Sequence, residues 1–88
     1  MTKQEIVDNV SAATGLTKVE TEAVMNGVMA LIIDTLSKNE RIELRGFGTF
    51  AVKHRQPKKA ETIYLEERYV PTFKPAKKMR LKVLNTLK

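Results

Sequence analysis

The apolar residues of this chain change their spacing after Asn39, and this change constrains the possible folds more than any other feature of the sequence. Before Asn39 they recur at every third or fourth position, which is the period of an α-helix. After Asn39 they alternate with polar residues, which is the period of a β-strand with one face on a core. The sequence therefore predicts an α+β protein in which a helical hairpin precedes a sheet.

Two capping signals divide the helical part of the chain. A threonine followed three residues later by a glutamate, the pattern of a capping box, occurs at residues 2–5 and again at 17–20, with Gly15 between them as a helix end. Helices are therefore expected over residues 3–14 and 18–36. The apolar residues of the second helix cover more than one stripe, which indicates burial on two sides. One side can pack on the first helix and the other on a second subunit, so we expect a dimer. A single central helix in a monomer is the weaker alternative, because little chain remains to cover it.

The second half of the chain has the signals of three strands and a last helix. The predicted strands alternate apolar and polar residues and cover residues 41–45, 49–55 and 62–70. Glycines on either side of Phe47 indicate a tight turn that directs this aromatic ring inward. The connection over residues 56–61 is polar and basic, so the hairpin that it joins has little core beneath it. A short helix over residues 76–87 is expected to follow the last strand.

The net charge of +6 is distributed unequally along the chain. Residues 1–40 hold three basic and six acidic side chains, which gives −3, and residues 41–88 hold thirteen basic and four acidic ones, which gives +9. Two basic sets stand out, one in the predicted hairpin and one in the last segment: Lys53, Arg55, Lys58 and Lys59, then Lys74, Lys77, Lys78, Arg80 and Lys82. A two-stranded ribbon can enter a DNA groove while its cationic side chains reach phosphates. The second half is therefore the candidate DNA-binding surface; a hairpin made cationic for solubility is the alternative.

The sequence offers little for catalysis, for a metal or for a cofactor. It has no cysteine and one histidine, His54, which is better explained as an exposed residue or a phosphate contact than as a catalytic base. The acidic neighbours Glu66 and Glu67 point to opposite faces of a strand, so they cannot share a proton-transfer site. No stretch approaches the ~20 apolar residues of a membrane span, and the N-terminus lacks an apolar signal core. We therefore expect a cytoplasmic protein that is not an enzyme and that has no metal, no cofactor, no small-molecule substrate and no membrane partner.

Two motifs occur in a fixed order after the helical hairpin: LRGFGTF at residues 44–50 and VPTFKPAK at residues 70–77. With them, the chain closely resembles the bacterial HU and integration host factor family of histone-like nucleoid proteins, and the resemblance covers its whole length. It implies an intertwined homodimer in which helices form a base, three-stranded sheets form a saddle, and two arms embrace double-stranded DNA. It also implies contact in the minor groove and kinking by apolar wedges.

The resemblance implies roles for individual residues as well. The implied DNA contacts are basic residues of the arm, of the segment beside it and of the helical base: Lys3, Lys53, Arg55, Lys58, Lys59, Lys74, Lys77 and Arg80. The implied structural residues of the turn and the core are Gly46, Phe47, Gly48, Phe50 and Phe73. The chain is then one domain, 1–88, with a helical dimerisation base over 1–40, the sheet and protruding β-arm over 41–75, and a short C-terminal helix over 76–88.

At the tip of the arm the sequence departs from the family. Between Arg55 and Val70 the family has several more residues, including an arginine-asparagine-proline tip whose proline wedges between base pairs. Pro57 lies too near the base of the arm to take that role. Either the arm is naturally short, or a tip segment is missing from the sequence; the flanking residues match the family without strain, which slightly favours the second. A naturally short arm predicts weaker binding and less bending.

The sequence thus predicts a nucleoid protein that binds and bends duplex DNA with little sequence specificity. A site-specific architectural cofactor of recombination or transcription is the alternative within nucleic-acid binding. A dimer whose basic face binds an acidic protein is the alternative outside it.

Overall fold

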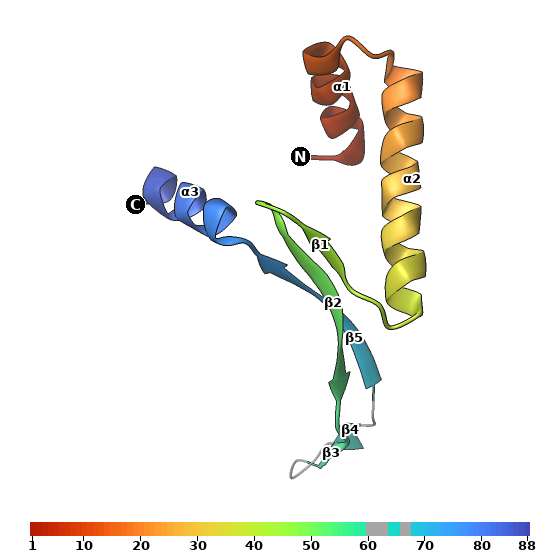
Figure 1. Ribbon diagram of the computed structural model, residues 1–88, viewed down its shortest axis with the longest axis vertical. Helices are drawn as coiled ribbons and strands as arrows, with labels where there is room; N and C mark the ends of the chain where they lie inside the picture. Colours follow the sequence, from red (N-terminus) through yellow and green to blue (C-terminus); the bar gives the residue numbers. More distant parts are fainter. Residues whose placement is uncertain (60–63, 66–67) are drawn as a thin grey trace. The chain divides into compact units, whose positions relative to one another are not determined.

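The computed structural model describes residues 1–59, 64–65 and 68–88, and the chain forms two compact units, Met1–Ile33 and Asp34–Lys88 (Figure 1). The elements, in chain order, are α1 (Lys3–Thr14), α2 (Lys18–Ser37), β1 (Ile42–Leu44), β2 (Gly48–Arg55), β3 (Lys58–Lys59), β4 (Tyr64–Leu65), β5 (Arg68–Pro75) and α3 (Lys77–Leu87). Two helices, a three-stranded antiparallel sheet and a last helix confirm the predicted α+β class. The prediction for Glu66 and Glu67 lies outside the described residues.

Hydrogen bonds at both ends of α1 confirm its predicted bounds. The backbone N–H of Glu5 donates to Oγ1 of Thr2 (3.2 Å), which satisfies one of the free donors of the first turn. The helix ends where Gly15 adopts a left-handed conformation with φ 79°, and the N–H of Gly15 donates to the carbonyl of Ser11 (3.0 Å).

At the start of α2 the capping box is reciprocal. The N–H of Thr17 donates to Oε1 of Glu20, and the N–H of Glu20 donates to Oγ1 of Thr17, both over 3.0 Å. The backbone hydrogen bond from Thr17, followed by the contact with the Thr17 side chain, stabilises the charged carboxylate and lowers the pKa of Glu20 below its ordinary value. The predicted helix over 18–36 therefore agrees with α2 to within one residue.

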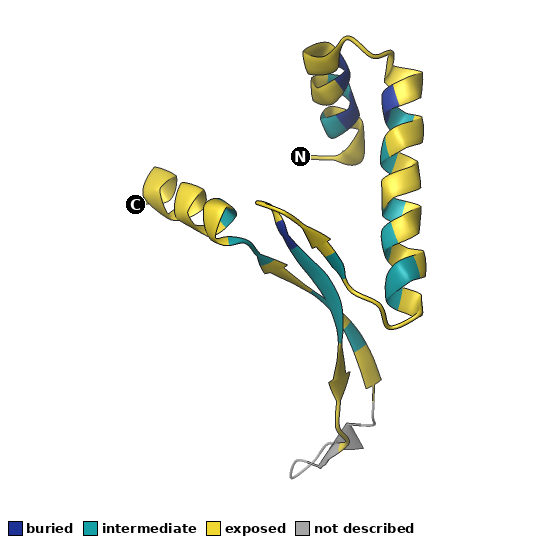
Figure 2. Cartoon of the chain, in the orientation of Figure 1, coloured by how far each residue is buried: buried dark blue, intermediate teal, exposed yellow. Residues whose placement is uncertain are grey.

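Within one chain the helices bury little of their apolar surface. Val7 is the one apolar side chain of the described core that is fully buried. Ser11 and Thr21 are also buried, and their hydroxyls donate to backbone carbonyls one turn earlier. Along α2, by contrast, Val24 is 61% exposed and Leu31 is 63% exposed. Figure 2 shows exposed residues along the length of this helix. One chain therefore leaves an apolar surface on α2 that a soluble protein would normally cover.

The three longer strands form one antiparallel sheet in the order β1-β2-β5. In its register Ile42 lies opposite Phe50, while Gly48 lies opposite Pro75 and Arg55 lies opposite Arg68. The central strand β2 therefore fixes the positions of both of its neighbours.

The third strand differs from its prediction over residues 62–70. The structure instead has the short strand β4 and the long strand β5, and β5 continues through Pro71 to Pro75. A proline removes a backbone donor, which a central strand cannot tolerate, but β5 lies at an edge of the sheet. The predicted strand end at Val70 is therefore wrong, because β5 continues past Pro71 to Pro75.

The arm, which is formed by β3 and β4 beyond the three-stranded sheet, continues the ladder of β2 and β5 without a change of register. Lys58 lies opposite Leu65 and Lys59 lies opposite Tyr64, with the same offset that joins Arg55 to Arg68. The predicted connection over 56–61 is too long, because Lys58 and Lys59 belong to a strand. The register of β2 and β5 therefore extends as far as Lys59 on one side of the hairpin and Tyr64 on the other.

The turn between β1 and β2 has the predicted glycine conformation but leaves its aromatic residue more open than expected. Gly46 has φ 80°, and the N–H of Phe47 donates to the carbonyl of Leu44 (2.9 Å), as in a β-turn with glycine at its third position. Phe47 is nevertheless 46% exposed in one chain. Its described ring contact, with Phe73, covers only one side of the ring, so a single chain does not enclose it.

Candidate nucleic-acid interface

Strand alternation places the apolar and the cationic side chains of the sheet on two different faces. Residues directly opposite each other in an antiparallel pair lie on the same face, so the register assigns each position. The apolar face carries Phe50, Val52, Pro71 and Phe73, with Ile42 and Leu44 from β1. The cationic face carries Lys53, Arg55, Arg68 and Lys74, with Thr49, Ala51, Val70 and Thr72 between them.

Aromatic packing holds the apolar face together. The ring centroids of Phe50 and Phe73 lie 4.7 Å apart, and those of Phe47 and Phe73 lie 5.3 Å apart. A Cβ atom on Gly48 would lie 2.4 Å from Cζ of Phe73 and 2.7 Å from the carbonyl oxygen of Lys74, so only glycine fits this close approach. These contacts explain why an aromatic and a glycine alternate around the turn.

The cationic face is exposed, and its basic side chains have no ion-pair partner among the described residues. Its four basic side chains are all solvent-exposed. Two ion pairs within the described part of the chain lie outside the sheet, Lys18 with Asp8 and Lys38 with Asp34. A third joins Arg41 to Glu43, which lies opposite Thr49 at the β1 side of this face. A face that carries four cations without described carboxylate partners attracts polyanions.

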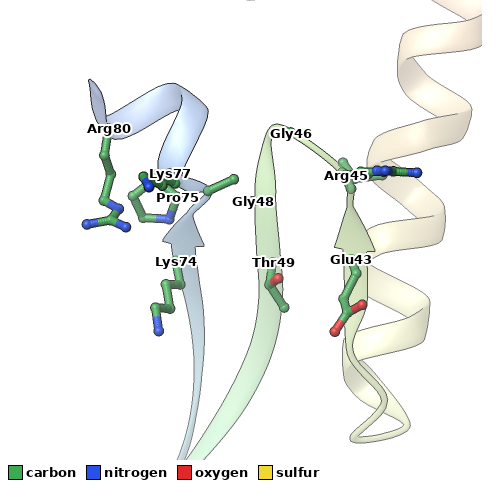
Figure 3. A pocket seen from close by; sticks show the side chains of 11 residues that line it. Glu43, Arg45, Gly46, Gly48, Thr49, Lys74, Pro75, Lys77 and Arg80 are labelled. Carbon is green, nitrogen blue, oxygen red and sulfur yellow. The ribbon is translucent and has the colours of Figure 1, made fainter. Parts of the chain in front are cut away.

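A hollow of about 520 Å³ lies where the cationic face reaches the start of α3 (Figure 3). Thr49 and Lys74 line it from the sheet, and Lys77 and Arg80 line it from α3. No side chain caps the N-terminus of α3, and its first turn has no acidic residue. Because free N–H groups and the helix dipole favour negative charge, this end of the sheet is suited to a phosphate group.

Glu43 is the acidic residue in the lining of that hollow. Figure 3 shows Thr49 between Glu43 on β1 and Lys74 on β5, in agreement with the register of the three strands. Glu43 forms an ion pair with Arg41, so its charge is already compensated within β1 and the segment before it. The local charge of the hollow therefore remains positive.

The predicted contact residues occupy several parts of the structure. Five of them lie in one compact unit on β2, β5 and α3: Lys53, Arg55, Lys74, Lys77 and Arg80. Lys58 and Lys59 continue the same ribbon as strand β3. Lys3 begins α1, in the other compact unit.

Sequence reasoning missed Arg68 as a member of this set. Arg68 begins β5 and lies opposite Arg55, on the cationic face. Strand parity could have found it, because Arg68 and Lys74 are an even number of residues apart and so share a face. The prediction instead ended the strand at Val70, which separated Arg68 from Lys74.

The one histidine of the sequence, His54, contacts two nearby side chains. His54 stacks on Tyr69 with ring centroids 4.8 Å apart, and its Nδ1 lies 3.1 Å from Nε2 of Gln56. Within residues 1–59, 64–65 and 68–88, no three acidic or histidine side chains are grouped so that they could hold a metal ion. None of the helices there is long and apolar enough to cross a membrane.

The fold and the site thus define a small basic protein with a surface suited to a polyanion. The family model described as bacterial DNA-binding protein matches residues 1–84, and the chain belongs to this family.

Similar proteins agree with this assignment. The chain is 38% identical over 90 residues to integration host factor subunit beta of Colwellia psychrerythraea, with 94% of this chain and 95% of the relative covered. Among solved structures, it is similar to Anabaena HU in a cocrystal with DNA, with a TM-score of 0.85, 29% identity and coverage of 94% of this chain and 97% of the other. The V42I mutant of HU from Thermotoga maritima gives a TM-score of 0.77, 32% identity and coverage of 94% and 99%.

The alignment with the Colwellia relative also bears on the length of the arm. It extends over 90 residues but includes 94% of this 88-residue chain, which is about 83 residues. About seven positions of the relative therefore have no counterpart in this chain. A naturally short arm and a missing tip segment would both produce such a shortfall.

Proposed function

We propose that this protein binds duplex DNA as a homodimer and holds it bent, with little dependence on base sequence. The observation that carries the proposal is the cationic face, which extends without a change of register into the arm. Such a ribbon neutralises phosphates along a duplex, and phosphate contacts fix position without reading sequence. The family and the HU–DNA cocrystal among the similar structures support the same ligand.

The homodimer follows from what one chain leaves uncovered. Val24 and Leu31 on α2 and Phe47 beside the sheet are all more than two-fifths exposed. A chain of this size buries too little apolar surface alone, and a second copy supplies the missing cover. In this proposal residues 1–40 form the dimerisation base, residues 41–75 the sheet and arm, and residues 76–88 the C-terminal helix, all within one domain.

Contacts to DNA are assigned to the basic residues of the arm and of its flank. The proposed set is Lys3, Lys53, Arg55, Lys58, Lys59, Lys74, Lys77 and Arg80. Those on the cationic face and around the hollow share one compact unit, which supports their assignment to one continuous surface. Gly46, Gly48, Phe47, Phe50 and Phe73 are assigned to the fold rather than to DNA.

A naturally short arm would limit how strongly the protein bends DNA. Minor-groove architectural proteins kink a duplex by inserting an apolar side chain between base pairs. The arm of this chain lacks the family's proline tip, and Pro57 lies before β3 rather than beyond it. A naturally short arm therefore predicts a smaller bend and weaker binding than a long-armed relative would give.

The protein acts in this proposal as a structural component and not as an enzyme, and it is associated with the nucleoid in the cytoplasm. Its matched relatives are HU proteins and integration host factor subunits, which supports this assignment. No cofactor, metal or small-molecule substrate has a part in it.

A second candidate is a site-specific architectural subunit that pairs with a different chain. It is favoured by one observation, the identity of 38% to integration host factor subunit beta of Vibrio cholerae, with 98% of that relative covered. It predicts a preference of about 10³-fold or more for one duplex over random DNA.

An electrophoretic titration on linear, nicked and prebent duplexes at several salt concentrations tests the proposal. We expect binding to all three, tighter binding to the nicked and prebent forms, and an affinity that falls steeply with salt. A salt-insensitive affinity, or a folded dimer that binds no duplex at all, would contradict DNA binding. Equal affinity for the three forms would contradict the bending component. A large preference for one sequence would favour the second candidate.

A further inference from the structure

The imidazole of His54 lies in the outer part of the β2–β5 ribbon, beyond the packed phenylalanine rings. In the register His54 lies opposite Tyr69, two residues further out than the pair of Val52 with Pro71. Its ring stacks on that of Tyr69, with centroids 4.8 Å apart and an angle of 25° between the two planes. Both residues are exposed, so this stack is in contact with solvent and is not part of the core.

A hydrogen bond at this ring shows its protonation state in the structure. Nδ1 of His54 lies 3.1 Å from Nε2 of Gln56, the residue that directly follows β2. An amide nitrogen donates and does not accept, so Nδ1 accepts and the ring is neutral, with its proton on Nε2. A second proton on Nδ1 turns this acceptor into a donor, and the amide of Gln56 must then present its oxygen instead. Nδ1 is therefore the atom at which the imidazole takes up a proton.

The described groups around the imidazole are one phenol and three cations. Tyr69 presents the phenol from β5 and is directly stacked on the ring. Lys53 and Arg55 adjoin His54 on β2, and Arg68 adjoins Tyr69 on β5. A second proton on His54 therefore adds a fourth cation to this part of the ribbon.

The charge of the imidazole acts on DNA across the ribbon. Strand alternation places His54 on the face opposite to Lys53 and Arg55, so its ring does not lie among the proposed phosphate contacts. Neighbouring Cα atoms are nevertheless only about 3.8 Å apart, and charges interact over about 8 Å at physiological ionic strength. A cation at His54 therefore strengthens the attraction of the phosphates that Lys53 and Arg55 hold in the proposed function.

Histidine is the side chain whose charge ordinarily changes between about pH 5 and pH 8. Lysine and arginine keep their charge over this range, so the assigned contact residues do not supply such a change. Linkage fixes its sign: if the protonated imidazole favours DNA, then DNA favours the protonated imidazole by the same factor. Affinity for DNA should therefore be highest at the acid end of this range and fall as the pH rises.

We infer that His54 is a proton-dependent switch of DNA affinity: protonation of its imidazole tightens the binding of duplex DNA, and the binding of DNA takes up protons at this side chain. The inference rests on the proposed function and deepens it, since it names how the site is regulated.

The test measures dissociation constants of the intact dimer for one mixed-sequence duplex by fluorescence anisotropy, at about pH 5.5 and about pH 8 and at constant ionic strength. We expect about fivefold tighter binding at the acid pH. The log–log salt slope should be steeper there by about 1–2, because each of the two subunits gains one charge. Calorimetric titrations near pH 6.5, in two buffers that differ in ionisation enthalpy, should show proton uptake on binding.

Three variants isolate the imidazole. His54→Gln cannot gain the charge, and should bind equally at both pH values and take up no protons. His54→Lys carries a charge throughout, and should bind at both pH values about as tightly as the wild-type protein does at the acid one. Tyr69→Phe keeps the stacked ring and removes the phenol, so it is the matched control and should keep the wild-type ratio. Circular dichroism at both pH values establishes that each variant is folded.

The outcomes separate this inference from the proposed function. If the wild-type affinity is the same at both pH values, or if His54→Gln keeps the wild-type ratio, the imidazole is not a switch and general DNA binding still holds. The same conclusion follows if His54→Lys binds no more tightly than His54→Gln. Loss of the ratio in Tyr69→Phe would assign the pH dependence to the phenol. If no duplex is bound at either pH, the proposed function itself fails.

Discussion

The two compact units of this chain expose different kinds of residues, and each kind requires a different partner. Met1–Ile33 carries two basic and four acidic side chains and exposes apolar residues along α2, among them Val24 and Leu31. Asp34–Lys88 carries fourteen basic and six acidic side chains. In its sheet, strand alternation places the basic residues of β2 and β5 on the face opposite to the phenylalanines. A second protein chain can cover the exposed apolar residues, whereas a polyanion can neutralise the exposed cations. The helical unit should therefore respond to protein concentration and the sheet unit to salt.

The largest effect is expected from a charge placed on the exposed apolar surface of α2. If α2 packs on a second subunit, Leu31→Asp buries an unpaired carboxylate, which costs about 3–5 kcal/mol and should dissociate or unfold the dimer. Sedimentation equilibrium and circular dichroism over a range of protein concentrations measure both. Asn26→Asp adds the same side chain at an exposed polar position of α2 and should leave the dimer intact. Equal, small effects of the two substitutions would show that α2 is not an interface.

The next effect concerns the cationic face. Replacing Lys53, Arg55, Arg68 and Lys74 together by glutamine should lower the affinity for duplex DNA roughly a hundredfold at moderate salt. It should also reduce the log–log salt slope by about 3–4, since each phosphate contact contributes about 0.9. Stability should not fall, because these cations have no described carboxylate partners. Lys18→Gln with Lys38→Gln, in ion pairs outside the sheet, is the control and should leave the slope unchanged. An unchanged slope in the fourfold variant would remove the cationic face from the site.

Two glycines should respond to the same substitution with opposite signs. Gly46→Ala forces a side chain onto a residue with φ 80°, and should destabilise the protein by about 1–2 kcal/mol. Gly27 lies within α2, and a Cβ there meets nothing within 4 Å, so Gly27→Ala should stabilise it by about 0.5–1 kcal/mol. Urea unfolding measures both. A loss of stability in the Gly27 variant would place that position against the partner subunit.

The smallest effect is a pH dependence in the helical unit. The pKa of Glu20 is lowered by its contacts with Thr17, so its contribution to stability is present above the unfolded-state pKa and is lost as the pH falls through the folded-state value. Because Glu20 is exposed, the effect should be small. Glu20→Gln should flatten the acid limb of a stability–pH profile measured by thermal unfolding. An identical acid limb in wild-type and variant would show that the capping box does not contribute to it.

The helices could be predicted closely from the sequence, and the sheet less closely. Capping boxes are local signals, so residues 2–5 and 17–20 located both helix starts without tertiary information. The end of a strand depends on which edge of the sheet it occupies. The third strand was therefore predicted to end at Val70, although β5 continues past Pro71 at the edge of the sheet.

The candidate site could be predicted only in part from the sequence, because some of its residues come together only when the strands pair. Lys53 and Arg55 stood out as a cluster in the sequence, but Arg68 joined them only through the pairing of β2 with β5. Register is a long-range property, and a one-residue slip moves a side chain to the other face. The hollow beside α3 likewise depends on the meeting of two elements, which local sequence patterns do not contain.

Lysine modification with and without duplex DNA, followed by mass spectrometry, tests most directly whether DNA lies against the cationic face, because lysines occur both on this face and outside the sheet. The account predicts that DNA protects Lys53, Lys74 and Lys77, which lie on the cationic face and around the hollow. Lys18 and Lys38, in ion pairs outside the sheet, should be modified at the same rate with and without DNA. Equal protection of both groups, or protection of Lys18 and Lys38 alone, would contradict the assignment of DNA binding to the cationic face.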